Sequence, residues 1–243
     1  MRTFVTLGSM RTEMCLHLHE AGRPGGRTLM YLHLLTGAGR CWPDTRIQLS
    51  PPRPVLSAGT VGRQDPPVLT STPAMPNVAH VLVGQVITAL EKRRVPGEAL
   101  LMGHGIAAAM AAVVCAVRPD LVCAAVLEDP PWFSPAPTTT PAADLDRMRL
   151  PTSWVDVAAA ITRPTLVVTG DREGDVLVGA RTRRQLAALD NPALEVVVVA
   201  GAGHDIRDGA PEAYLAAVEP WVSRHLAARA WADTSPRDGA GVA

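Results

Sequence analysis

Residues 101–110, LMGHGIAAAM, constrain the fold of this chain more than any other stretch. The residues just before the Gly-His-Gly triplet, Gly97 to Met102, are mostly apolar and predict a buried strand. The residues after it, Ile106 to Val117, are rich in alanine and predict a closely packed helix. A strand that passes into a helix through a tight glycine turn is typical of α/β proteins. The stretch therefore predicts an α/β architecture with Gly105 in the turn.

The same alternation of strands and helices continues to the end of the chain. Short apolar runs over residues 121–129, 164–171 and 194–201 predict further strands. Helices are expected over residues 178–189 and 211–230. Because the two kinds of element alternate, we predict a mostly parallel, doubly wound sheet with helices on both faces.

The N-terminal half predicts a hairpin, one more strand, a long proline-rich loop and a helix. These elements are expected at residues 3–9 with 13–20, at 26–35, at 51–77 with a short strand at 54–58, and at 78–94. His17 and His19 lie two residues apart on one face of the hairpin, a spacing that could hold a metal. No third ligand neighbours them, so we assign them no function.

The length and composition fit one domain. A chain of 243 residues with 47% hydrophobic residues has enough apolar side chains for one large core. We expect a single domain over residues 1–231. Residues 232–243 are rich in Gly, Ala, Asp and Pro and predict a disordered tail.

The balance of acidic and basic residues bears on the expected partners, and the apolar runs bear on the expected location. Twenty-three basic residues balance twenty-three acidic ones, which does not favour nucleic acid or an anionic membrane as a partner. We expect a small, largely apolar molecule instead. The sequence shows no signal peptide and no apolar run long enough to span a bilayer, so we expect a cytoplasmic protein.

The four cysteines do not form a recognisable site. Cys15, Cys41, Cys115 and Cys123 are too scattered for a metal knuckle or a redox pair, so we expect free thiols. Nothing in the sequence calls for a metal or another cofactor, and we expect neither.

Five segments in order resemble the α/β-hydrolase superfamily along nearly the whole chain. They are LHLLTGAGRCW, GHGIA, EDPPW, TGDREGD and GAGHDI. In that family a nucleophile turn comes first, an acid next and a histidine last, and the segments keep this order. The resemblance implies an α/β-hydrolase fold with a short lid at residues 134–162.

The resemblance also implies a catalytic site in which the serine of the G-x-S-x-G nucleophile turn is replaced by Gly105. The general base would be His204 in GAGH. The oxyanion site would use the backbone N–H groups of Ile106, after the turn, and Leu35, after the strand that carries His33. Backbone donors do not depend on the missing serine.

Several residues compete for the acid that would orient the histidine. Glu173 has the family's usual spacing from the strand PTLVVTG, and Asp171 and Asp175 are alternatives in the same turn. Another family position for the acid, after the preceding strand, matches Asp129. His104 in the turn and Trp132 in EDPPW complete the expected substrate-binding residues.

The chain departs from the family pattern close to the chemistry. The family's His-Gly before the oxyanion donor is His33-Leu34, and the glycine that ends the nucleophile turn is Ala107. The aspartate common in a D-x-x-G-x-G turn corresponds to Gly59. These changes leave the acyl-transfer chemistry in question.

Without a nucleophile an acyl-enzyme is not expected, which leaves three alternatives. His204 could activate a water for direct attack on a carbonyl, or it could move a proton within the substrate, as in a lyase, isomerase or cyclase. The third alternative is an inactive pseudoenzyme that binds a ligand or a protein partner. The enzyme alternatives are favoured because the histidine, the candidate acids and both backbone donors keep suitable places.

Overall fold

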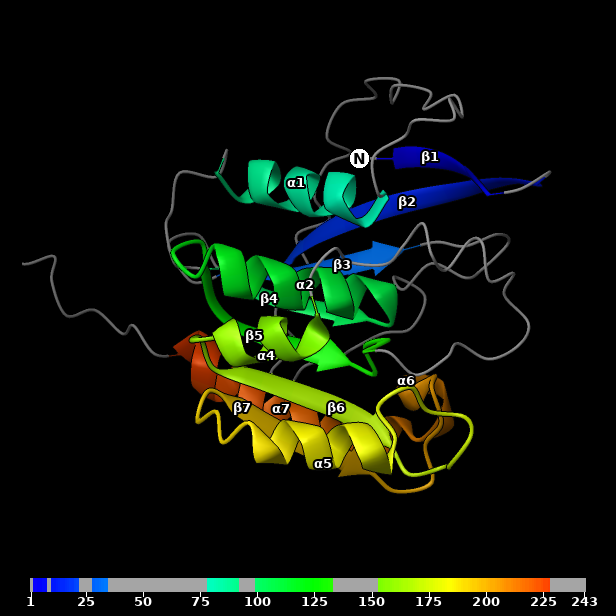
Figure 1. Cartoon of the computed structure of the whole chain (residues 1–243), viewed down its shortest axis with the longest axis vertical. Coiled ribbons are helices and arrows are strands. Elements are labelled where there is room, and N and C mark those ends of the chain that lie inside the picture. Colours follow the sequence, from blue (N-terminus) through cyan, green and yellow to red (C-terminus); the bar gives the residue numbers. More distant parts are fainter. Residues whose placement is uncertain are drawn as a thin grey trace, which may run out of the picture.

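The computed structural model describes residues 2–7, 10–21, 28–34, 78–91, 99–132 and 153–227. In these residues seven strands form one sheet, in the order of the sequence (Figure 1). The strands are β1 (Arg2–Leu7), β2 (Met10–Ala21), β3 (Thr28–Leu34), β4 (Ala99–His104), β5 (Val122–Glu128), β6 (Thr165–Gly170) and β7 (Leu194–Val199). The helices are α1 (Val78–Glu91), α2 (Ile106–Val117), α4 (Trp154–Ala160), α5 (Ala180–Ala188), α6 (Ile206–Gly209) and α7 (Pro211–Ala227).

The sheet is mostly parallel, as predicted. β1, β2 and β3 pair antiparallel, and the hairpin register brings Leu7 opposite Met10. From β3 onwards every neighbouring pair is parallel. A parallel pair needs a crossover connection, which the intervening helices supply.

Helices cover both faces of the sheet and divide the core in two. On one face α1, α2, α4 and α5 pack over a cluster that includes Leu101, Ala125 and Val167 (Figure 1). On the other face α7 packs over a cluster that includes Leu100 and Val126. Neighbouring residues of one strand belong to opposite clusters because successive side chains point to opposite faces. Strands buried on both faces explain the continuous apolar runs in the sequence.

Most predicted elements are confirmed, with ends that differ by a few residues. The predicted helix at 106–117 matches α2, and the predicted helix at 211–230 matches α7 as far as Ala227. The loop at 51–77, its strand at 54–58 and the tail at 232–243 lie outside the described residues. α4 lies inside the segment where the sequence predicts a lid with one or two short helices, whereas the short α6 was not expected as a separate helix.

The end of the predicted lid is part of the core. α4 falls inside the expected lid at 134–162, but its residues Val157 and Ala158 are buried in the cluster beneath α2. The lid prediction therefore remains untested for residues 134–152, all of which lie outside the described residues.

The parallel strands place their carboxyl ends along one edge of the sheet. Ligands of open α/β sheets bind beyond this edge, so side chains from separate loops meet there. In the described ranges, no helix has both the length and the apolar character needed to cross a membrane.

Candidate active site

The turn between β4 and α2 has the geometry that the sequence predicts. Gly105 has φ of +55°, in the left-handed region that favours glycine. A Cβ on Gly103 would lie 2.7 Å from backbone atoms of Ala107, so α2 approaches β4 too closely for a side chain there. The Gly105 amide donates a 2.8 Å hydrogen bond to the carbonyl oxygen of Glu128, which ties the turn to the end of β5.

His204 faces the position where Gly105 lacks a side chain. An ideal Cβ on Gly105 would lie 3.5 Å from both Nε2 and Cε1 of the His204 ring. A hydroxyl on that Cβ, turned toward the ring, would come within the reach of a general base, about 2.6–3.2 Å. The geometry thus brings together the turn and the histidine that the family resemblance pairs.

The partner of His204 is Asp129. The Nδ1–H of His204 donates a 2.7 Å hydrogen bond to Oδ2 of Asp129. Asp129 is fully buried, whereas the His204 side chain is 35% exposed. A neutral imidazole with its proton on Nδ1 leaves the Nε2 lone pair free to accept a proton, on the side of Gly105.

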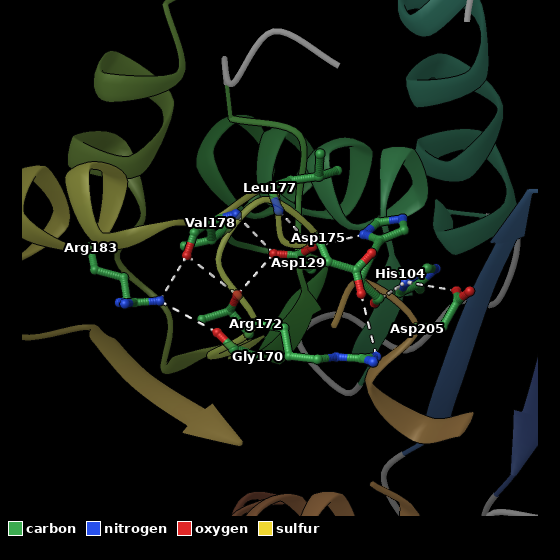
Figure 2. Close-up of polar contacts among 11 residues, drawn as sticks. His104, Asp129, Gly170, Arg172, Asp175, Leu177, Val178, Arg183 and Asp205 are labelled. Carbon is green, nitrogen blue, oxygen red and sulfur yellow. Dashed lines mark hydrogen bonds and ion pairs between the residues drawn. The ribbon is translucent and has the colours of Figure 1, made fainter. Parts of the chain in front are cut away.

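Backbone and hydroxyl donors fix the carboxylate of Asp129 (Figure 2). Oδ1 accepts hydrogen bonds from the Val178 amide at 2.8 Å and the Thr169 hydroxyl at 2.9 Å, and Oδ2 accepts one from the Leu177 amide at 2.8 Å. Asp129 itself has φ of +40°, a conformation that costs a non-glycine residue energy. Surrounding contacts hold this carboxylate in place despite the backbone strain.

The two histidines of the site have opposite pKa shifts. Burial lowers the pKa of His204, but the hydrogen bond and charge of Asp129, with Asp205 and Asp175, outweigh it and the net pKa is raised. The pKa of His104 is lowered, mainly by burial and also by the positive charge of His204, although Glu128 opposes this shift. His104 therefore has the lower pKa of the two rings.

The structure does not bring Glu173, the acid favoured by sequence spacing, to the histidine. Glu173 and Asp171 both have exposed side chains in the β6–α5 turn. Asp171 accepts a 2.8 Å hydrogen bond from the Gly201 amide, and Asp175 pairs with Arg172 at 3.3 Å. The reason is positional: Asp129 directly follows β5, which lies between β4 and β6, so it faces His204 from the middle of the sheet edge.

The expected oxyanion donors are only partly described. Ile106 is the first residue of α2, so the helix itself does not use its amide. His33 and Leu34 end β3, which pairs with β4 through Leu32 opposite Gly103, so they lie beside the turn. Leu35 and Gly59 lie outside the described residues.

The two remaining binding candidates have different surroundings. The Nε2–H of His104 donates a 2.9 Å hydrogen bond to the carbonyl oxygen of His204, and the two rings lie 4.4 Å apart. Trp132 is buried in the core beneath α2 and stacks on Trp154 at 5.6 Å. Its indole N–H has no hydrogen-bond acceptor among the described residues.

His104, His204 and Asp205 are the described residues best placed to hold a metal. Their ligand atoms lie within 4.8 Å of one another, and two histidines with a carboxylate suit ions such as Zn²⁺. However, Nε2 of His104 already bonds a backbone carbonyl, and Asp205 is 77% exposed. We therefore assign no metal to this cluster.

The two described cysteines do not offer a nucleophile at this site. Cys115 is fully buried on α2, and burial together with Cys123 raises its pKa to about 12. A thiol with this pKa is not a nucleophile at neutral pH. Among the described residues, Cys115 and Cys123 form no disulfide.

A buried group beside Asp129 escaped the sequence analysis. Glu128 is fully buried and binds Arg207 and Tyr214, which come from α6 and α7. An acidic residue at the end of an apolar strand was the available signal, but the sequence does not indicate its partners.

No family model matches the chain, and no curated protein matches it. Several solved structures do match the chain. A monoacylglycerol lipase of Paleococcus ferrophilus matches with a TM-score of 0.50 and 15% identity over 60% of this chain and 76% of the lipase. An E-2-(acetamidomethylene)succinate hydrolase matches with a TM-score of 0.48 and 21% identity over 64% of this chain and 77% of that one. A Pyrococcus furiosus esterase matches with a TM-score of 0.43 and 16% identity, over 53% and 54% of the two chains.

The three neighbours are a lipase, a hydrolase and an esterase. At 15% identity, the likeness to the lipase concerns the fold alone. The lipase likeness agrees with the mostly parallel sheet, its helices on both faces and the strand–glycine–helix turn. The chain therefore has the α/β-hydrolase fold.

Proposed function

We propose that this protein is an enzyme that uses His204 as a general base, without an acyl-enzyme, on a small apolar carbonyl compound. The observation that carries the proposal is the arrangement of the His204 ring. The Nδ1–H of His204 donates a 2.7 Å hydrogen bond to Oδ2 of Asp129, and the Nε2 of His204 lies 3.5 Å from the Cβ position of Gly105. A base held in one tautomer beside vacant side-chain space suits proton removal from a small molecule placed there.

In the first reaction that this arrangement supports, a water takes the place of the serine hydroxyl. Nε2 of His204 removes a proton from the water while its oxygen attacks the carbonyl carbon of an ester or lactone. The Ile106 amide donates to the developing oxyanion. The intermediate then collapses and the leaving oxygen takes the proton from His204. An ester gives an acid and an alcohol, and a lactone gives one hydroxy acid.

In the second reaction, Nε2 removes a proton from the substrate itself. The Ile106 amide would stabilise the resulting enolate or alkoxide, and His204 would return the proton to another atom of the substrate or product. This is the chemistry of a lyase, an isomerase or a cyclase. The balanced charge of the chain supports an uncharged, largely apolar substrate in either case.

The test compares ester hydrolysis by the wild type with three variants: Gly105→Ser, Gly105→Ala and His204→Ala. Gly105→Ala is the matched control, because it adds the same Cβ at the same strained φ, at a cost of about 1–3 kcal/mol, but no hydroxyl. We expect a burst of product only in Gly105→Ser. Slow wild-type turnover that is lost in His204→Ala supports water attack.

Proton transfer needs a separate readout. Deuterium incorporation into ketones and esters in D₂O, followed by NMR, should depend on His204 in the wild type. If neither hydrolysis nor exchange depends on His204, the general-base proposal is wrong. A ligand that binds the wild type and His204→Ala equally well would then favour the binding protein over the enzyme.

A further inference from the structure

The segment that carries His204 is held from the ends of two neighbouring strands. His104 ends β4 and Glu128 ends β5, and these two residues are register partners in the sheet. His104 binds the backbone of residue 204, and Glu128 binds the side chain of residue 207. We infer that His104 and Glu128 are positioning residues that hold the 204–207 segment so that His204 keeps the orientation a base requires. The inference rests on the proposed role of His204.

The contact at residue 207 is a buried ion pair. Glu128 is fully buried, and Arg207 is only 10% exposed. The Arg207 Nε–H donates a 2.7 Å hydrogen bond to Oε2 of Glu128, and Nη2 donates to Oε1. Two buried charges of this kind are costly to separate, because the remaining charge would have neither water nor a partner.

Tyr214 joins the ion pair to α7. Its hydroxyl donates a 2.5 Å hydrogen bond to Oε1 of Glu128, and the Arg207 guanidinium lies 4.9 Å from the centre of its ring. Tyr214 is almost fully buried in the core on the α7 face. The ion pair therefore anchors Arg207 of α6, three residues after His204, to both the sheet and α7.

The contact at residue 204 is a hydrogen bond from the neutral ring of His104 to the backbone of His204. His104 donates from Nε2 to the His204 carbonyl at 2.9 Å, and burial keeps its pKa below the ordinary value. Figure 2 shows His104 close to Asp205, which follows His204. The hydrogen bond fixes the backbone of His204, while Asp129 fixes its ring.

Glu128 also connects this segment to the Gly105 turn. Its backbone carbonyl accepts the 2.8 Å hydrogen bond from the Gly105 amide, and its neighbour Asp129 binds His204. One residue thus contacts the turn with its backbone and the 204–207 segment with its side chain. In a site without a serine, these contacts hold His204 in place of the hydroxyl that would otherwise bond to Nε2.

The test follows His204 by NMR, which needs no substrate. Long-range ¹H–¹⁵N spectra of the full chain give the tautomer and the pKa of His204 in the wild type and in Glu128→Gln. In Glu128→Gln we expect the His204 ring to populate both tautomers and its pKa to fall, because the segment loosens and the contact with Asp129 weakens. Glu91→Gln is the matched control, since it removes the charge of an exposed ion pair with Arg118 and should change neither.

A second pair of variants separates positioning from stability. Glu128→Met with Arg207→Met replaces both buried charges with apolar side chains of similar size, which often preserves stability. If this double variant keeps the wild-type Tm but mixes the tautomers of His204, positioning is supported. If it and Glu128→Gln both keep the wild-type tautomer and pKa, the inference is wrong.

His104 is tested by rescue. His104→Phe keeps a ring but removes the donor, whereas His104→Gln keeps a donor. In His104→Phe we expect His204 to populate both tautomers. In His104→Gln we expect the ¹H–¹⁵N spectrum of His204 to remain close to that of the wild type. Where turnover is measurable, loss of position should lower kcat about 10- to 100-fold with little change in KM. Turnover that depends on His204 but is unaffected by all these variants would overturn the inference and leave the proposed function standing.

Discussion

At the scale of single residues, one carboxylate sets the proton affinity of the candidate base. Burial alone would lower the pKa of His204, and Asp129 is the main reason that it is raised. A reaction that needs the neutral imidazole should therefore speed up as the pH rises through this raised pKa. The position of that rise reports directly on Asp129.

Asp129→Asn should shift the pKa of His204 from above to below its ordinary value. The variant removes the negative charge, while the burial that lowers the pKa remains. A titration of His204 by NMR measures the shift, and any pH–rate profile should move to lower pH with it.

Glu173→Gln is the control for this prediction, since Glu173 is the exposed acid that sequence spacing favours. Its titration should match the wild type. A wild-type pKa in Asp129→Asn together with a lowered one in Glu173→Gln would show that the acid had been assigned to the wrong residue.

The sequence predicted that His204 and Gly105 lie at one site, and they do face each other, but it did not choose the carboxylate that contacts His204. Both are recognisable because glycines surround them in a fixed motif order. The acid depends on which strand end faces the histidine across the sheet, and spacing along the chain does not encode this. For the same reason the sequence did not indicate the roles of Arg207 and Tyr214. Their common partner, Glu128, lies 79 and 86 positions away from them in the chain.

At the scale of elements, the close approach of α2 to β4 depends on Gly103. Gly103→Ala should lower the free energy of unfolding by at least about 2 kcal/mol, because the new Cβ would lie 2.7 Å from backbone atoms that cannot rotate away. Denaturant unfolding of the purified variant measures the loss.

Gly84→Ala gives the opposite expectation for the same chemical change. Gly84 is an exposed position of α1 with nothing within 4 Å of its Cβ site. Alanine there should raise the free energy of unfolding by about 0.5–1 kcal/mol, since it restricts the unfolded chain. Equal effects of the two variants would mean that α2 does not pack on β4 as described.

Helices and strands were predictable where the apolar pattern of the sequence was strong. β5, β6 and β7 are continuous apolar runs bounded by polar or turn residues, and α2 has a strand and a glycine turn before it. α4 and α6 are seven and four residues long, too short to show helical periodicity. α4 in particular depends on tertiary contacts with α2.

At the scale of the whole molecule, one helix packs against one face of strands β4 to β7. α7 contributes buried side chains at Tyr214, Val218, Trp221 and Val222. At about 1.5–3 kcal/mol each, their burial is worth about 6–12 kcal/mol. This is comparable to the entire stability of an ordinary domain, about 5–15 kcal/mol.

A chain that ends at residue 210 should therefore fail to fold, whereas a chain that ends at residue 231 should keep the wild-type Tm. The shorter chain lacks α7, and the longer one lacks only the tail that composition predicts to be disordered. Circular dichroism melts distinguish the two. A cooperative melt from the shorter chain would show that α7 is dispensable for the core.

The strand order has a consequence for how the chain is made. Each strand pairs with the one synthesised just before it, so the sheet can grow one strand at a time as the ribosome advances. The candidate base and α7 emerge last. Until then the buried carboxylates at the end of β5 have no cationic or histidine partner, and one face of the sheet is uncovered. We therefore expect the site to assemble and the α7 face of the core to close together, late in biosynthesis.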